Sequence, residues 1–181
     1  IPFISHNEKP TRREALEYFR RVNEDWNLNI KFYEKVSTIK KLDNKIFDVN
    51  TSKKTYKCKS VIVVTGFYDL PKTIDVSGGN LPKVKHYYDD WHPYIGQKVA
   101  VVGAANSACD VALELYHKGA EVTMVIRKES ISPRVKYWIK PNIESRIKEG
   151  SIPAFFQSNI TQIKKGEITI QTPEKYITIE N

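Results

Sequence analysis

The chain has 181 residues, of which 40% are apolar, and a formal net charge of +8. No window approaches the roughly 18 consecutive apolar residues that a membrane span needs, and the basic residues are interleaved with acidic ones rather than gathered in a stripe. These features predict a globular cytoplasmic protein and argue against a membrane or a nucleic acid as its partner.

The first predicted element is an amphipathic helix that starts after Pro10. Thr11 and Glu14 have the spacing of a capping box, in which each side chain bonds the backbone N–H of the other residue. Apolar residues then recur at helical intervals, at Ala15, Phe19, Val22 and Trp26. This pattern predicts a helix of about four turns.

Short alternating segments follow the helix and predict a small antiparallel β-meander. They cover Ile30 to Tyr33, Ser37 to Leu42, Ile46 to Val49 and Thr55 to Lys57, with turn signals at Asp43-Asn44 and Thr51-Ser52. Val61 to Val64 is a continuous β-branched run that ends in Thr65-Gly66. Such a run is typical of a fully buried strand in the middle of a sheet.

Residues 68–97 are rich in Pro, Gly and Asp and lack periodicity, which is typical of a connector between domains or a functional loop. We place a domain boundary near Gly96. The next segments predict a strand over Lys98 to Val102, a helix over about Asn106 to Lys118 and a strand over Glu121 to Ile126, which together make a βαβ unit.

The end of the chain predicts a further helix with Pro141 in its first turn and Gly150 after it, then an extended segment over Ile152 to Phe156 and a hairpin around Lys165-Gly166. The expected fold class is therefore α/β. Residues 97–181 form a Rossmann-like nucleotide-binding domain, and residues 1–96 hold the first helix, the meander, the Thr65-Gly66 strand and the linker.

The loop after the first strand of the βαβ unit stands where a dinucleotide-binding GxGxxG belongs. Gly103 takes the tight turn, while Ala105 and Ala108 occupy the positions that let a pyrophosphate approach the backbone and let helix and strand pack closely. The helix N-terminus offers backbone N–H groups and partial positive charge. The predicted pyrophosphate site comprises Gly103, Ala104, Ala105, Asn106, Ser107 and Ala108, with side-chain hydrogen bonds available from Asn106 and Ser107. A βαβ turn without a ligand is the alternative.

The second strand of the unit ends in Arg127-Lys128, which bears on the choice of cofactor. An acidic residue there would bind the ribose 2′-hydroxyl of NAD, whereas a 2′-phosphate needs cations. Guanidinium pairs with phosphate through charge-assisted hydrogen bonds, so the sequence favours NADP(H). Glu129 is a mild counter-signal, one or two positions too late. Arg134 and Lys136 could reach the same phosphate or belong to a solvated surface.

With these motifs, the sequence resembles the flavoproteins with two dinucleotide-binding domains, and among them the thioredoxin-reductase-like family of the bacillithiol-disulfide reductase type. The resemblance rests on Ile1 to Arg12, Val63 to Gly66 with Pro71, His86-Tyr87-Tyr88, Gly103 to Asp110, and Val135 to Asn142. It implies an oxidoreductase that passes hydride from NADPH to FAD and on to a disulfide-type or other oxidised small-molecule acceptor. It also implies that Thr65 and Gly66 end the strand that links the FAD and NADPH domains and belong to the cofactor-binding residues.

The sequence departs from this family at three points. It lacks the GxGxxG of the FAD domain and the late Gly-Asp motif that contacts the flavin, and it begins with Ile1, so we expect a piece of a longer protein in which residues 1–96 are part of the FAD domain. It also lacks the CxxC of thioredoxin reductases, because Cys58 and Cys109 lie far apart, and the two alone offer no zinc site. A catalytic cysteine is expected outside this chain.

Two other functions stay open at this point. Flavin-containing monooxygenases have a linker that Gly79, His86 and Trp91 loosely echo. A non-catalytic nucleotide-sensing module would share the same loop and strand end. The oligomeric state also stays open, and a homo-oligomer is compatible with the sequence.

Overall fold

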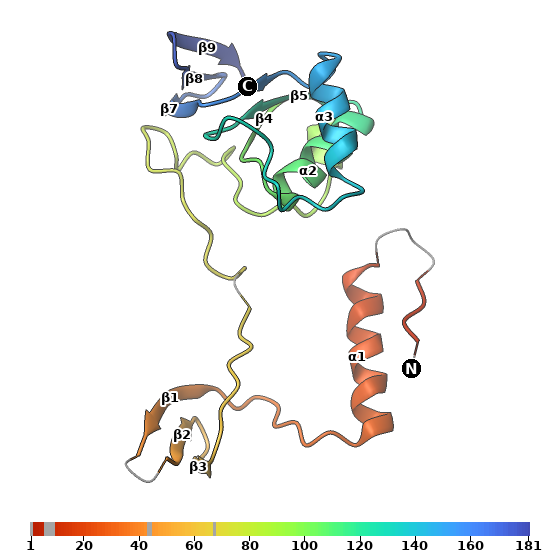
Figure 1. The fold of residues 1–181 in the computed structure, drawn as a ribbon, viewed down its shortest axis with the longest axis vertical. Helices are drawn as coiled ribbons and strands as arrows, with labels where there is room; N and C mark the ends of the chain where they lie inside the picture. The colour runs from red at the N-terminus through yellow and green to blue at the C-terminus, as the bar shows by residue number, and fades with distance from the viewer. Residues whose placement is uncertain (1, 6–9, 43–44, 67) are drawn as a thin grey trace. The chain divides into compact units, whose positions relative to one another are not determined.

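The computed structural model describes residues 2–5, 10–42, 45–66 and 68–181, which fall into two compact units, Ile1–Thr65 and Gly66–Asn181 (Figure 1). The predicted turn at Asp43-Asn44, and Ile1 and residues 6–9 of the N-terminal segment, lie outside the described residues. Within the described ranges, no helix combines the length and the apolar character that a bilayer crossing requires.

The first unit contains the predicted helix, α1 (Arg12–Trp26). Its capping box is formed, since Thr11 Oγ1 accepts a hydrogen bond from the Glu14 N–H at 3.2 Å and the Glu14 carboxylate accepts one from the Thr11 N–H at 2.7 Å. No residue of α1 is buried, and Phe19 and Trp26 are 65% and 70% exposed. The apolar stripe of this helix therefore meets no core in the first unit.

The predicted meander is confirmed as a three-stranded antiparallel sheet. It consists of β1 (Val36–Lys41), β2 (Phe47–Thr51) and β3 (Thr55–Cys58), in chain order. The segment Ile30 to Tyr33 is not a strand, because it turns, with Tyr33 at a left-handed φ of +54°.

The prediction of a buried strand at Val61 to Val64 is wrong. The segment has no strand structure, and Ile62 and Val64 are 87% and 84% exposed. Its β-branched side chains favour an extended backbone, but a strand also needs a neighbour that satisfies its N–H and C=O groups. No such neighbour pairs with it in the part of the chain that the structure describes.

The second unit contains the predicted βαβ unit, which confirms the α/β fold class. β4 (Lys98–Val102), β5 (Glu121–Val125) and β6 (Ala154–Phe155) form a parallel sheet in the order β4-β5-β6. α2 (Asn106–His117) connects β4 to β5, and α3 (Lys140–Lys148) lies between β5 and β6. In the register of the sheet, Val102 lies opposite Val125.

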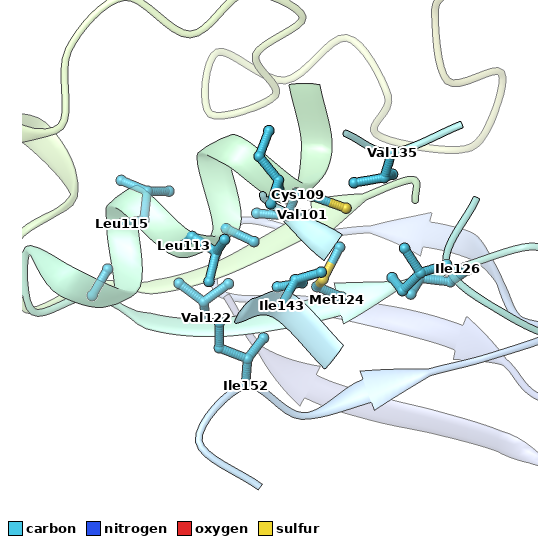
Figure 2. Close-up of a cluster of buried hydrophobic side chains, with 14 residues drawn as sticks. Val101, Cys109, Leu113, Leu115, Val122, Met124, Ile126, Val135, Ile143 and Ile152 are labelled. Carbon is cyan, nitrogen blue, oxygen red and sulfur yellow. The ribbon is translucent and has the colours of Figure 1, made fainter. Parts of the chain in front are cut away.

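The two faces of β5 pack against different layers. Val122 and Met124 belong to a cluster that also holds Ile143 of α3 and Cys109 and Leu115 of α2, as Figure 2 shows. We call it the helix-side core. Val125 belongs to a second cluster, the sheet-side core, which also contains Ile160, Ile163, Ile168 and Ile170. The side-chain alternation of a strand explains this division.

The sheet-side core is covered by an antiparallel sheet of β7 (Asn159–Ile163), β8 (Glu167–Gln171) and β9 (Tyr176–Glu180). The predicted hairpin around Lys165-Gly166 joins β7 to β8 and is confirmed. β9, which pairs with β8 at the edge of this sheet, was not predicted from the sequence.

The linker, residues 68–97, packs against the rest of the second unit. Apart from a short 3-10 helix, η1 (His92–Tyr94), it has no named element, yet its apolar side chains contact both cores. Val76, Leu81 and Val84 pack on the sheet-side core, and Tyr88, Trp91 and Tyr94 pack on the helix-side core. The linker therefore belongs to the second compact unit, which begins at Gly66, and the boundary near Gly96 between two dinucleotide-binding domains stays a prediction.

Candidate functional site

The loops that follow β4 and β5 leave the parallel sheet at the same edge. Val102 and Val125 are register partners, and the Gly103 N–H donates a hydrogen bond to the Val125 C=O at 3.0 Å. The Gly103 loop and the segment that begins at Ile126-Arg127 are therefore neighbours. Ligands of open α/β sheets bind outside the carboxyl ends of the strands, which is where these loops lie.

Gly103 has the conformation that the motif requires. Its φ is +124°, a region that side chains disfavour, and a Cβ built on it would lie 3.4 Å from the Ala108 Cβ. A larger residue at position 108 would crowd this approach further. The small residues at the first and third motif positions therefore both serve the close passage of α2 past the end of β4.

The N-terminus of α2 is not capped by a side chain. Its N-cap residue is Ala105, with extended backbone at φ −98° and ψ −179°, and the first backbone bond of the helix runs from the Cys109 N–H to the Ala105 C=O at 3.0 Å. Among the described residues, no protein acceptor serves the N–H groups of Asn106, Ser107 and Ala108. These groups are available to an anion, and the helix dipole favours negative charge there.

The connection from β5 to α3 folds back onto the Gly103 loop. The Ser132 N–H donates to the Ala104 C=O at 3.0 Å. The Asn106 side chain makes two further bonds, because its Nδ2 donates to the Arg134 C=O at 3.3 Å and its Oδ1 accepts from the Lys136 N–H at 2.9 Å. The structure thereby brings Arg134 and Lys136 to the start of α2.

Sequence reasoning missed this folding-back. A signal was present, since the aliphatic residues of this connection, Ile131, Val135 and Ile139, recur at intervals of four. All three are buried in the helix-side core. Their burial pulls the connection toward the start of α2. The bonds of Asn106 itself could not be read from the sequence, where the residue was expected to face the phosphates.

All four cations of the predicted site are exposed. Arg127, Lys128, Arg134 and Lys136 form no ion pair within 4.0 Å in the described part of the chain. The segment after β5 is held in place, because the Gln157 N–H donates to the Lys128 C=O at 3.0 Å. The counter-signal Glu129 is exposed as well. The Lys136 ammonium lies 5.2 Å from the centroid of the Trp138 ring. The loops at this edge thus offer positive charge that no described carboxylate neutralises.

Thr65 is the last residue of the first compact unit, and Gly66 is the first residue of the second. Both are exposed, and Gly66 has a positive φ of +73°, as a turn would require. Residues 61–64 form no strand that Thr65 and Gly66 could end, and the role of these two residues beside a cofactor stays a prediction.

Two of the three residues that echo the monooxygenase linker, Gly79 and Trp91, have packing roles. A Cβ on Gly79 would lie 2.1 Å from the Ile74 carbonyl oxygen, so no larger residue fits without a backbone shift. Trp91 stacks on His92 with ring centroids 3.7 Å apart and packs on the helix-side core. Packing alone accounts for these two residues.

Cys109 is unsuited to thiol chemistry. It is fully buried in the helix-side core, and this burial raises the pKa of its thiol to about 11, so the reactive thiolate is scarce at neutral pH. In the described ranges, no three His, Cys, Asp or Glu side chains gather as a metal site would require. The unbonded backbone N–H groups at the start of α2 and the exposed cations beside them suit an anionic ligand.

Comparison with known proteins agrees with this geometry. A model of the family described as pyridine nucleotide-disulphide oxidoreductase matches residues 1–181. Bacilliredoxin reductase Bdr of Bacillus subtilis is 40% identical over 182 residues, which cover 100% of this chain and 56% of that protein. The chain therefore spans little more than half the length of this relative.

Solved structures give the same result. Bacillithiol disulfide reductase Bdr from Staphylococcus aureus is 39% identical with a TM-score of 0.81, and the protein of that name from Bacillus cereus is 35% identical with a TM-score of 0.83. Each match covers 100% of this chain and 56% or 57% of the other. The thioredoxin reductase of T. acidophilum shares the fold at 21% identity, with a TM-score of 0.67 over 93% of this chain. The resemblance inferred from the sequence is confirmed, and the chain belongs to the pyridine nucleotide-disulphide oxidoreductase family.

Proposed function

We propose that this chain binds NADP(H) at the edge formed by the Gly103 loop and the end of β5, as part of a flavin-dependent enzyme that reduces a disulfide. One observation carries the proposal. The N-terminus of α2 is uncapped, and the loops beside it present four exposed cations that have no ion-pair partner among the described residues. A dinucleotide with an additional phosphate matches both features.

The residues at this edge would divide the cofactor between them. The backbone N–H groups of residues 106–108 would bind the pyrophosphate, with Gly103, Ala104 and Ala105 allowing it to approach and the Ser107 hydroxyl adding a hydrogen bond. Arg127 and Lys128, joined by Arg134 and Lys136, would bind the 2′-phosphate. This charge arrangement favours NADPH over NADH.

The rest of the reaction lies with the cofactors and with the acceptor. NADPH supplies a hydride and FAD, in the complete protein, carries the electrons to the acceptor. The residues of this chain bind and orient, with Thr65 and Gly66 proposed on the flavin side. A disulfide acceptor is favoured because relatives at 40% and 39% identity are named as bacilliredoxin and bacillithiol disulfide reductases. The chain has no CxxC, so we assign it no direct dithiol relay.

The charge assignment is tested by titrating the full-length protein with NADPH and NADH. Arg127→Ala removes a charge-assisted phosphate contact, so we expect NADPH binding to weaken by about 1.5–3 kcal/mol and NADH binding to change little. Lys165→Ala, at an exposed cation in the hairpin between β7 and β8, is the control and should alter neither. Equal losses for the two nucleotides would refute the role of Arg127.

A further inference from the structure

We propose that Asn106 is a positioning residue, which clamps the loop carrying Arg134 and Lys136 against the start of α2 and thereby sets the preference for the phosphorylated cofactor. This inference rests on the proposed NADP(H) site. It reassigns a residue that the sequence pattern places among the direct phosphate ligands.

The amide of Asn106 is already committed to the loop. Asn106 is the first residue of α2 and half-buried, and its Oδ1 and Nδ2 bond the backbone of Lys136 and Arg134 at 2.9 and 3.3 Å. A planar amide presents its acceptor and donor in a fixed geometry, so both bonds form only when the two loop residues lie in one register. A side chain with one polar function could not specify that register.

The position of the loop backbone determines where the side chains of Arg134 and Lys136 begin. Val135, between them, is only 5% exposed and packs in the helix-side core, as Figure 2 shows, whereas Arg134 and Lys136 are exposed. The side chain of Val135 therefore faces the core, and those of Arg134 and Lys136 face solvent. The backbone of these two cations is hydrogen-bonded to Asn106 at the start of α2. The Ser132 N–H, which bonds the Ala104 C=O at 3.0 Å, secures the same loop one step earlier.

The orientation of the amide also argues against a main role at the phosphates. Its acceptor oxygen, which would repel an anion, is held by the Lys136 N–H, and one of its two Nδ2 hydrogens is used by the Arg134 C=O. These hydrogen bonds reduce the conformational entropy of the loop before any ligand binds. The benefit is that two flexible cationic side chains start from fixed positions, which lowers the cost of ordering them on binding.

A double-mutant cycle in the full-length protein separates positioning from direct contact. Asn106→Ala should weaken NADPH binding about 5- to 10-fold and leave NADH binding within about 2-fold, because the loop that positions two of the four cations, Arg134 and Lys136, at the 2′-phosphate is no longer held. In a protein that already carries Arg134→Ala and Lys136→Ala, the same substitution should add less than about 2-fold. Additive losses, or an equal loss for NADH, would overturn the proposal in favour of a direct pyrophosphate contact.

Hydrogen exchange without ligand gives an independent readout of the clamp. In Asn106→Ala, the Lys136 amide should exchange at least about 10-fold faster, because it loses its acceptor. Asn106→Asp keeps that acceptor and should keep the amide protected, which also shows that position 106 tolerates substitution. Asn159→Ala, at an exposed asparagine that starts β7, should change nothing. Unchanged exchange in Asn106→Ala would overturn the clamp. If the unaltered protein bound neither nucleotide, the proposed function would fail while this readout still decided whether Asn106 holds the loop.

Discussion

The two compact units differ in what holds them. Every residue that the structure describes as buried lies at Val101 or later, in the unit Gly66–Asn181. The unit Ile1–Thr65 has a well-capped helix and a three-stranded sheet, but none of its described residues is buried. Local signals are clear in both units. Capping residues, alternation of apolar and polar residues, and turn residues thus specify individual helices and strands. A core requires, in addition, that helices and strands distant in sequence pack against one another.

This difference has an energetic consequence. A helix of about 15 residues is only marginally stable alone in water, and a small sheet needs a packed face for independent stability. In the second unit, two buried clusters supply that packing on both faces of β5. We therefore expect the second unit to unfold cooperatively and the first to open by local fluctuations.

The largest effect should come from truncating a core side chain. Ile143 is fully buried in the helix-side core, so Ile143→Ala should lower the free energy of unfolding by about 2–5 kcal/mol, as urea denaturation would measure. Phe19→Ala removes a larger side chain from α1 that is 65% exposed, and it should change that free energy by less than about 0.5 kcal/mol. Comparable losses for the two variants would break the contrast between the units.

An intermediate effect on the free energy of unfolding should appear when the pH is raised, because Cys109 is fully buried in the core of the second unit. Burial raises the pKa of its thiol to about 11, from a usual value of 9.0. The native thiol thus holds its proton more tightly than the unfolded one, so its contribution to stability is complete below pH 9 and is lost as the pH rises toward 11. We expect a loss of about 2 kcal/mol over this window, measured by urea unfolding at a series of pH values. Cys109→Ala should remove this part of the pH dependence, and a Cys109 variant with an unchanged profile would contradict the assignment.

The smallest effect should be confined to α1. Thr11→Ala removes the side chain that caps the Glu14 N–H, which costs the helix about 1 kcal/mol. Because α1 has no buried residue, hydrogen exchange should speed up for the amides of α1 and stay the same for those of β5. A change of exchange in β5 would show that the two units are energetically coupled.

The sequence predicted the elements whose signals are local. The capping box of Thr11 and Glu14, the βαβ unit around Gly103 and the hairpin at Lys165-Gly166 each depend on residues close in the chain. Val61 to Val64 was misassigned because a β-branched run indicates extended backbone but not the partner that makes it a strand. β9 was missed for a related reason, since its alternation lies beyond a hairpin that already seemed complete.

The same division applies to the candidate site. Gly103 and its positive φ follow from the motif, and the exposed cations at Arg127-Lys128 follow from the strand end. The position of Arg134 and Lys136 does not, because it depends on three hydrogen bonds between loops about 30 residues apart, a distance over which single-sequence patterns carry little information. The role of Asn106 depends on its hydrogen bonds to Arg134 and Lys136, which lie far from it in the sequence.

The linker's packing sets how this nucleotide-binding module could be moved or shortened. A fragment that begins at Gln97 would retain every named strand and both α-helices of the second unit. It would, however, lack Val76, Leu81 and Val84, which pack on the sheet-side core, and Tyr88, Trp91 and Tyr94, which pack on the helix-side core. Such a fragment would show apolar patches to solvent and tend to aggregate. The shortest fragment that keeps both cores covered is therefore the compact unit that begins at Gly66. It includes the linker, although residues 68–97 contain no named strand or α-helix.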